Sequence, residues 1–279
     1  MDGQAIRGGL GVKALRITGG EPTVRPGLVD WIRTIRDTLP AIHNIAMTTN
    51  GVLLDRVAPQ LADAGVDRVN ISLDSLRPDR FRIITRGGEL KRVQQGISAA
   101  IDSFHQVKVN VVALQNGNMD ELEDFVRFSD RLGVDVRLIE PMPLGTEKDY
   151  WRDVYISVDE IHDLLSRAGF ELIPCSQHHG FAPATSYTVP GTRARLGFIS
   201  QMSCTKCADC NKLRLTSDGT LRPCLLSAEE IPLQQLITSR NTKGFLNAMS
   251  TAFLERAFEN NPEDATRKSL GRSMECIGG

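Results

Sequence analysis

The first half of the chain alternates between two patterns of apolar residues. Short runs rich in β-branched residues predict buried strands at 12–18, 44–49, 68–73, 107–114 and 134–140. Between them, apolar residues at helical spacing predict helices at 28–37, 55–64, 90–103 and 119–132, the last with Asn118 as its cap and Gly133 as its end. This alternation indicates βαβ units and a parallel sheet. Five units are fewer than a closed barrel contains, so the pattern fits either an open α/β sheet or part of a barrel.

Polar and glycine-containing motifs mark the strands, mostly at their carboxyl ends. In parallel α/β proteins the carboxyl ends of the strands build the active site, so we expect a functional site at this edge of the sheet. The motifs are Gly19-Gly20-Glu21-Pro22, Thr48-Thr49-Asn50-Gly51, Ser72-Leu73-Asp74-Ser75, Lys108-Val109-Asn110 and Glu140-Pro141-Met142.

The pattern changes after about residue 145. It predicts a helix at 158–168, strands at 185–189 and 195–199, a hairpin that turns at Ser217-Asp218-Gly219, and helices at 232–237 and 244–258. We therefore expect two parts, a partial barrel over residues 1–145 and a C-terminal extension over 146–279 that covers its mouth.

Composition narrows the class of protein. The 279 residues are 41% hydrophobic and 24% charged, which is typical of a globular chain that can bury a core. A net charge of −1 provides no global field for nucleic acid or an anionic membrane, so any anionic ligand must be held by local charges. The chain contains no signal peptide pattern and no run of membrane-spanning length, and we expect a cytoplasmic protein without membrane or nucleic-acid partners.

Four of the six cysteines form the pattern C-x2-C-x2-C-x13-C at Cys204, Cys207, Cys210 and Cys224. Thiolates at this spacing can converge on a zinc ion or on an iron–sulfur cluster, and the spacing alone fits both. Structural zinc uses four ligands, whereas a four-iron cluster on three cysteines leaves one iron open to substrate. Structural cysteines without a metal are the third interpretation.

Three further features have both a functional and an ordinary interpretation. Gly19 and Gly20 let backbone approach a ligand and Glu21 suits an ammonium group, but the motif is also a plain turn. Arg16 and Lys108 lie within apolar strands and, with Lys212 and Arg214, suit a polyphosphate, although single cations usually face solvent. The final Gly278-Gly279 pair is typical of a frayed end, or it threads into a narrow cavity.

The motifs together resemble a known family. L-R-I-T-G-G-E-P (from Leu15), T-T-N-G, N-I-S-L-D-S-L, K-V-N, R-L-I-E-P-M, C-x2-C-N-K-L-R with D-G-x-L-R-P-C-L, and the final Gly-Gly occur in the order found in GTP 3′,8-cyclases. The resemblance covers nearly the whole chain. It implies an α/β fold, a partial (β/α) TIM-like barrel of the radical S-adenosylmethionine (SAM) type with a C-terminal iron–sulfur extension.

The resemblance also implies the chemistry. In this family an N-terminal 4Fe-4S cluster reduces SAM to a 5′-deoxyadenosyl radical, which removes hydrogen from C3′ of GTP. C3′ then bonds to C8 of guanine, giving (8S)-3′,8-cyclo-7,8-dihydroguanosine 5′-triphosphate for molybdenum cofactor biosynthesis. The product passes to cyclic pyranopterin monophosphate synthase, and a homodimer is a further expectation. A second, auxiliary 4Fe-4S cluster holds the guanine through its open iron.

Carried over by position, the resemblance assigns a role to each motif residue. SAM is contacted by Gly20, Glu21, Ser72 and Met142. GTP is contacted by Arg16, Thr48, Lys108, Lys212, Leu213 and Arg214. The auxiliary cluster is bound by Cys207, Cys210 and Cys224. Gly278 and Gly279 enter the active site as catalytic residues, which reverses the ordinary interpretation of a frayed end.

The chain departs from the family in three ways. No cysteine precedes Cys175, so the C-x3-C-x2-C motif of the radical-generating cluster is absent, together with the first βα unit. We expect a truncated coding sequence rather than a short paralogue, with the flank of strand 12–18 exposed. Cys204 is additional, and we expect it to be a bystander. Lys212 replaces an arginine and loses the bidentate fork.

Three functions compete on this evidence from sequence. The first is a GTP-cyclising radical SAM enzyme, inactive or incomplete as this chain. The second is a non-catalytic nucleotide- or metal-binding paralogue without the radical cluster. The third is another radical SAM enzyme, such as a peptide-modifying one, which the paired Arg16 and Lys108 and the segment 212–214 disfavour.

Overall fold

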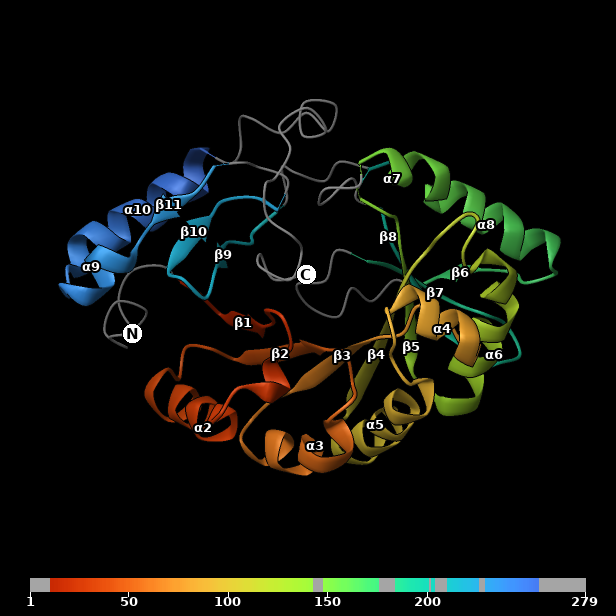
Figure 1. Ribbon diagram of the computed structural model, residues 1–279, viewed down its shortest axis with the longest axis horizontal. Coiled ribbons are helices and arrows are strands. Elements are labelled where there is room, and N and C mark those ends of the chain that lie inside the picture. Colours follow the sequence, from red (N-terminus) through yellow and green to blue (C-terminus); the bar gives the residue numbers. More distant parts are fainter. Residues whose placement is uncertain are drawn as a thin grey trace.

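One curved, mostly parallel sheet dominates the molecule (Figure 1). The computed structural model describes residues 11–142, 148–175, 184–200, 202–203, 210–225 and 229–255. The sheet has eight strands in the order β1-β2-β3-β4-β5-β8-β7-β6. Neighbours from β1 to β8 pair in parallel, and β7 and β6 continue the sheet antiparallel. The sheet is thus the open, curved wall of a partial barrel, which is one of the two architectures that the α/β pattern allowed and the one that the resemblance implied.

The strands coincide closely with the apolar runs. Asn44–Thr49 and Arg195–Ile199 were predicted with the same bounds, and the other predicted strands differ by one or two residues at their ends. The two-residue strand Ile173–Pro174 was not predicted. The strands of the large sheet are β1 (Ala14–Ile17), β2 (Asn44–Thr49), β3 (Arg68–Ser72), β4 (Gln106–Val112), β5 (Asp135–Ile139), β6 (Ile173–Pro174), β7 (Thr185–Thr188) and β8 (Arg195–Ile199).

Helices cover the convex face of this sheet, where their apolar stripes meet the apolar sides of the strands (Figure 1). Short helices at Pro78–Ile84 and Lys148–Val154 were not predicted, because each is too short to display a helical period. The helices are η1 (Pro22–Val24), α2 (Leu28–Thr38), α3 (Leu54–Asp63), α4 (Pro78–Ile84), α5 (Leu90–Ser103), η2 (Met119–Glu121), α6 (Leu122–Leu132), α7 (Lys148–Val154), α8 (Val158–Arg167), α9 (Gln234–Thr238) and α10 (Thr242–Glu255).

The end of α6 was predicted correctly, but its cap was not. Gly133 ends the helix in the left-handed conformation, at φ 68°. Asn118 stands at the N-cap position of the 3-10 turn Met119–Glu121, which leads into α6, but its side chain makes no capping hydrogen bond there. Its buried side chain instead accepts from the N–H of Leu114 at 2.8 Å and donates to the carbonyls of Asp74 and Val112. Asn118 therefore organises the loop after β4.

The two faces of the sheet differ in chemistry. Side chains that alternate along each strand point to opposite faces. The convex set is apolar and lies in one core, for example Ile45, Val69, Val109 and Val136, all without exposed surface. The opposite set is polar and charged, and it lies on the concave, inner face.

The strand β8 continues the large sheet although it comes from the second half of the chain. It pairs in parallel with β5 over five residues, from Asp135 opposite Arg195 to Ile139 opposite Ile199. The sheet itself therefore extends beyond residue 145, past the position at which the sequence pattern changes.

A second, smaller sheet stands across from the inner face, next to α9 and α10 (Figure 1). It contains β9 (Arg214–Leu215), β10 (Thr220–Arg222) and β11 (Ile231–Pro232), with β9 and β10 joined as the predicted hairpin. Its own small core contains Leu221, Leu233 and Ala252, against which Leu213 packs.

Among the described residues, no helix combines the length and apolar character needed to cross a membrane.

Candidate functional site

The Gly-Gly-Glu-Pro motif forms a turn at the carboxyl end of β1. Gly19 has φ 126°, a conformation that favours glycine, and both glycines are exposed. The carboxylate of Glu21 accepts from the backbone N–H of Thr23, from the hydroxyl of Thr49 at 2.7 Å and from the N–H of Asn50 at 2.7 Å. Glu21 thus ties the turn after β1 to the turn after β2, and the two glycines present their backbone beside it.

The turn after β2 is held from below by α5. Gly51 has φ 80°, and Gly96 of α5 lies so close that a Cβ there would stand 2.0 Å from the carbonyl oxygen of Gly51. This close approach fixes the height of the turn above the sheet. Ser72 at the end of β3 is exposed, and Met142 beyond β5 is half-buried. The predicted SAM residues Gly20, Ser72 and Met142 therefore belong to the carboxyl ends of strands β1, β3 and β5.

Five cations line the inner face of the parallel strands, namely Arg16, Arg68, Lys108, Arg137 and, opposite Asp135, Arg195. Arg16 on β1 and Arg68 on β3 both lie opposite Ala46 of the intervening strand β2, so their side chains are on the same face. Lys108 on β4 lies opposite Asn70 of β3, on that same face. Arg137 follows on β5, two residues after Asp135. Asp135 is the sole carboxylate that β1 to β5 and β8 direct to this face within the described residues.

Lys108 and Arg137 are the buried members of this cation group, and Lys108 pairs with a carboxylate. Its Nζ lies 3.6 Å from Oδ2 of Asp135, whose Oδ1 lies 2.7 Å from Nε of Arg195. Burial first, and then repulsion from Arg137, lowers the pKa of Lys108 to about 8. One carboxylate shared between two cations leaves an excess of positive charge on the inner face.

Three arginines of the inner face, Arg16, Arg68 and Arg137, repel one another. Burial, followed by repulsion from Arg16, lowers the pKa of Arg137 to about 10, which leaves the guanidinium charged at neutral pH. Desolvation, then repulsion from Arg68, lowers the pKa of Arg16, although its side chain is exposed by area. A side chain surrounded by protein atoms but not sealed from solvent is what an open cavity provides. Arg16 is therefore close to other cations while its side chain remains open to solvent.

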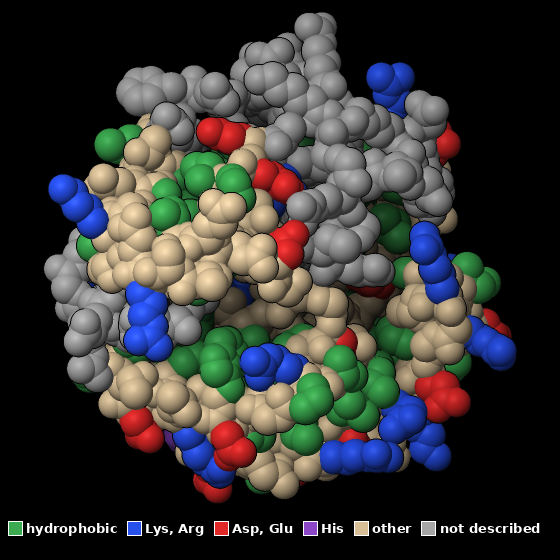
Figure 2. Space-filling view, turned by 60° about the vertical axis from the view of Figure 1, so that its left-hand side comes forward, with side chains coloured by type: hydrophobic (Ala, Val, Ile, Leu, Met, Phe, Trp, Pro, Cys, Tyr) green, Lys and Arg blue, Asp and Glu red, His purple; other side chains and the backbone are tan. Residues whose placement is uncertain are grey.

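The hairpin brings two more cations close to those of the inner face. Burial and then repulsion from Arg16 lower the pKa of Lys212 to about 8. Burial also lowers the pKa of Arg214, while attraction to Cys224 and Cys210 opposes that shift. Residues 196 or more positions from Arg16 thus share its electrostatic surroundings. In the turned view of Figure 2, the surface is hollowed between the two halves of the molecule.

Thr48 and Leu213 occupy different positions in this arrangement. Thr48 lies on β2, opposite Asn70, and its hydroxyl accepts from Nδ2 of Asn70 at 3.3 Å. It faces the inner side with Arg16. Leu213 packs into the core of the small sheet between Lys212 and Arg214, so its side chain supports the hairpin.

The predicted metal ligands are described only in part. Cys210 and Cys224 are half-buried and both attract Arg214. The predicted ligand Cys207, the additional Cys204, and the predicted catalytic pair Gly278 and Gly279 lie outside the described residues. Within the described part of the chain, no three His, Cys, Asp or Glu side chains are grouped to hold a metal ion.

Sequence reasoning missed Arg68, Asn70 and Arg137. The first two occupy the strand predicted at 68–73, and the third begins the R-L-I-E-P-M motif. The sequence did contain a signal for them, because they alternate with apolar core residues along their strands, as Arg16 and Lys108 do. This alternation shows which face of the sheet a side chain occupies, but it does not show which residues of different strands are neighbours. Oδ1 of Asn70 accepts from Arg137 at 3.4 Å across two strands, a contact that only the register reveals.

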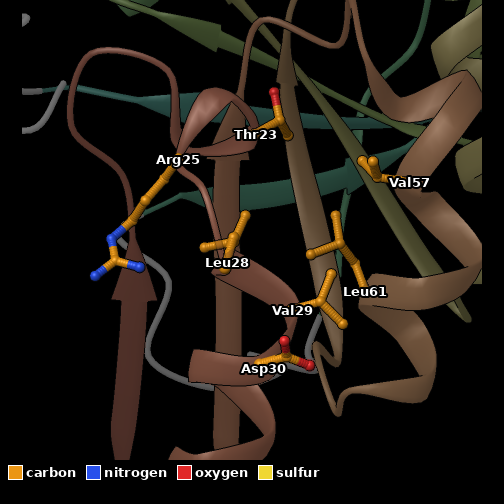
Figure 3. A pocket seen from close by; sticks show the side chains of 8 residues that line it. Thr23, Arg25, Leu28, Val29, Asp30, Val57 and Leu61 are labelled. Carbon is orange, nitrogen blue, oxygen red and sulfur yellow. The ribbon is translucent and has the colours of Figure 1, made fainter.

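A separate pocket of about 290 Å³ lies on the convex side, between α2 and α3 (Figure 3). Leu28, Val29 and Leu61 approach one another there, whereas Arg25 points away from them. None of the predicted site residues lines it, so we do not assign it to the functional site.

Comparison with known proteins agrees with this architecture. The profile of the Radical SAM superfamily matches residues 4–129, and that of Molybdenum Cofactor Synthesis C matches residues 134–262. GTP 3′,8-cyclase of Alkaliphilus oremlandii is 41% identical over 97% of this chain and 83% of its own length. GTP 3′,8-cyclase of Heliobacterium modesticaldum is 43% identical over 82% of this chain and 70% of its own.

Among solved structures, coproporphyrinogen III oxidase (HemN) from Escherichia coli, a radical SAM enzyme, aligns with a TM-score of 0.45 and 15% identity. The alignment covers 68% of this chain and 51% of that one. So distant a likeness adds nothing to the argument from sequence and geometry.

Proposed function

The chain belongs to the GTP 3′,8-cyclase family, and from this premise we propose that it acts on GTP. The reaction bonds C3′ of the ribose to C8 of guanine, giving (8S)-3′,8-cyclo-7,8-dihydroguanosine 5′-triphosphate in molybdenum cofactor biosynthesis. The relatives reported above carry this name, which does not favour the non-catalytic alternative.

One observation supports the substrate class more than any other. Arg16, Arg68, Lys108 and Arg137 share the inner face with a single carboxylate, in a chain whose net charge is −1. Concentrating repelling cations in one place is unfavourable unless an anion binds there. A triphosphate provides several oxygens for guanidinium and ammonium groups, with charge-assisted hydrogen bonds.

Each substrate-binding residue takes a role in this proposal. Arg16 and Lys108 bind phosphates from the inner face, and Thr48 offers a hydroxyl beside them. Lys212 and Arg214 close the site from the hairpin, with Leu213 packed behind them. In this way the walls on two sides hold one substrate molecule, so that its ribose and base are presented in a fixed orientation.

SAM belongs at the carboxyl ends of the strands. The backbone of Gly20 offers close approach to the ligand, and the Glu21 carboxylate stabilises that turn. Ser72 offers an exposed hydroxyl, and Met142 completes the contact from the end of β5.

The auxiliary 4Fe-4S cluster fits the residues of the hairpin. Cys210 and Cys224 are half-buried beside Arg214, and Cys207 would be the third ligand. When bound on three cysteines, such a cluster supplies an open iron that can hold the guanine. The chain would contribute the thiolates and the cations around them.

The radical-generating cluster does not fit the residues of this sequence. No cysteine occurs before Cys175, so β1 and the residues ahead of it provide no thiolate ligand. We therefore derive no step through that cluster from these 279 residues.

The remaining assignments complete the proposal. Residues 1–145 would form the barrel part and 146–279 the extension, with β8 returning to the barrel sheet. Gly278 and Gly279 would enter the active site from the carboxyl terminus. Cyclic pyranopterin monophosphate synthase would take the product, and the chain would form a homodimer in the cytoplasm.

Equilibrium binding of GTP to the purified chain tests the substrate assignment. Replacing Arg16→Ala removes a charge-assisted hydrogen bond worth about 1.5–3 kcal/mol, so we expect roughly tenfold or greater weakening by calorimetry. The control is Arg33→Ala, because Arg33 is exposed on α2 and its ion pair within the described part of the chain is with Asp30 of its own helix. An Arg16→Ala variant that binds GTP like the original chain would contradict the site.

A further inference from the structure

Glu140 is a buried carboxylate for which the proposed reaction has no use. It follows β5 directly and precedes Pro141 and Met142, and 1% of its side-chain surface is exposed. A buried carboxylate is costly unless donors surround it. The donors around Glu140 therefore indicate what it is for.

Four donors from two distant segments converge on this carboxylate. Oε1 accepts from the N–H of Val158 at 2.9 Å and from the hydroxyl of Ser203. Oε2 accepts from the N–H of Met202 at 2.9 Å and from the N–H of Ser203 at 3.0 Å. The backbone N–H of Glu140 also donates to the carbonyl of Ile199 at 3.1 Å, at the end of β8.

These contacts join three parts of the molecule. Val158 is the first residue of α8, where a negative charge is favoured by the helix dipole. Met202 and Ser203 directly precede the segment that carries Cys204, Cys207 and Cys210. Glu140 thus fixes the point at which the chain leaves β8 for the cysteine segment.

We propose that Glu140 is a positioning residue for the auxiliary iron–sulfur cluster. The inference rests on the proposed function, because it needs a cluster on Cys207, Cys210 and Cys224. Glu140 does not bind the metal. It holds the start of the cysteine segment against the end of β5, two residues from Met142, so that the cluster side and the SAM side keep one relative position. Groups that fix the position of metal ligands influence how well the metal is retained, and Glu140 would act on the ligands through the chain that leads from Ser203 to them.

Glu121 provides a matched control. It is also fully buried, and its carboxylate accepts from the hydroxyl of Ser75 at 2.8 Å and from the N–H of Leu76 at 2.6 Å. Its ion pair is with Arg80 at 2.7 Å. None of these partners belongs to the cysteine segment or the hairpin, so Glu121 stabilises the fold without touching the proposed cluster.

The experiment compares Glu140→Ala with Glu121→Ala in the whole chain, reconstituted anaerobically with iron and sulfide. We measure the rate at which an iron chelator removes the visible absorbance, the electron paramagnetic resonance spectrum of the reduced cluster, and folding by circular dichroism. Glu140→Ala should lose iron about 10- to 100-fold faster than the original chain and change the spectrum. Glu121→Ala should do neither. Glu140→Gln keeps an oxygen that can accept from both Met202 and Ser203, and it should retain most of the cluster.

Other outcomes separate the inference from the proposed function. If the original chain retains a cluster and Glu140→Ala retains it equally well, Glu140 has no positioning role. If both alanine variants lose iron at the same raised rate, the effect is general destabilisation and the inference is wrong. If the original chain takes up no iron, the proposed cluster itself fails. Should Glu140→Ala not fold, Glu140→Asp is compared with Glu121→Asp, with the same expectations.

Discussion

At the scale of single residues, the proposed site is a group of cations that lower one another's pKa values. Lys108 lies on the large sheet and Lys212 just before β9 of the small sheet, yet burial and neighbouring arginines lower the pKa of each to about 8. Their ordinary pKa is 10.5. The charge that would bind a triphosphate is therefore titratable close to neutral pH, whereas the charge of the arginines is not.

This crowding predicts a pH dependence of GTP binding. Raising the pH from about 7 to about 9 should remove the charge from both lysines and weaken binding. In the double variant Lys108→Arg with Lys212→Arg the charge persists, so the affinity should change much less over that range. Calorimetry at matched ionic strength measures both. Parallel pH profiles for the two proteins would contradict the assignment of the lysines to the site.

The same two pKa shifts affect the stability of the ligand-free protein, and there a rise in pH has the opposite effect to the one expected for GTP binding. The unfolded chain keeps these lysines protonated up to their ordinary pKa of 10.5, while the folded chain releases the protons near 8. Because the unfolded state binds more protons in this window, the contribution of the two lysines to stability rises with pH from about 8 to about 10.5. Binding and stability thus respond oppositely to pH.

At the scale of elements, turns between strands and helices hold the site in place. Glu21 joins the turns after β1 and β2, and Asn118 organises the turn after β4. Both act through side chains that satisfy backbone groups, which a turn cannot satisfy by itself. The sequence identified the motif of Glu21 but assigned Asn118 the wrong partner, because helix caps and turn anchors use the same residue types.

The role of Asn118 can be measured as stability. Asn118→Ala removes three hydrogen bonds in a buried site, and we expect the free energy of unfolding to fall by about 2–4 kcal/mol. Asn116→Ala is the control, since Asn116 is exposed and, among the residues that the structure describes, its side chain donates to a single group, the carbonyl of Asp153. It should change the free energy of unfolding by roughly 0.5 kcal/mol or less. Urea denaturation gives both values, and equal losses would refute the anchoring role.

At the scale of the whole molecule, the site lies between two sheets that the chain builds far apart in sequence. The large sheet contributes its concave, cationic face, and the hairpin of the small sheet contributes two thiols and two more cations (Figures 1 and 2). Neither sheet alone encloses a ligand. The function therefore depends on how the two parts are held together, in which Glu140 has a central place.

The metal assignment is a prediction at this scale. Protein purified without oxygen should be brown and contain iron and sulfide. Replacing Cys207, Cys210 and Cys224 together by Ser should abolish both colour and iron while circular dichroism still reports the folded sheet. Colourless original protein with stoichiometric zinc would overturn the assignment, since the spacing of the cysteines fits that metal as well.

The sequence by itself determined the local elements, the family and most of the motif residues. Apolar periodicity is a short-range property, so it predicted β2, α5 and β8 with the bounds observed. Chemistry concentrated in short motifs, such as Gly19 to Glu21, was visible for the same reason. The helix Pro78–Ile84 was not predicted, because it has too few turns to show a helical period of apolar residues.

Only the tertiary structure decided which of these residues are neighbours. The pairing of β5 with β8 joins positions about 60 residues apart, and no local pattern encodes that register. The same kind of register, from β1 to β5, puts Arg68 and Arg137 on the face that carries Arg16 and Lys108. The β5–β8 pairing brings the end of β8, and with it Ser203, to Glu140. The physical reason is that the spacing of apolar residues within one segment shows which side of a strand or helix is buried. Contacts between strands join residues far apart in the sequence, and these depend on the fold of the whole chain.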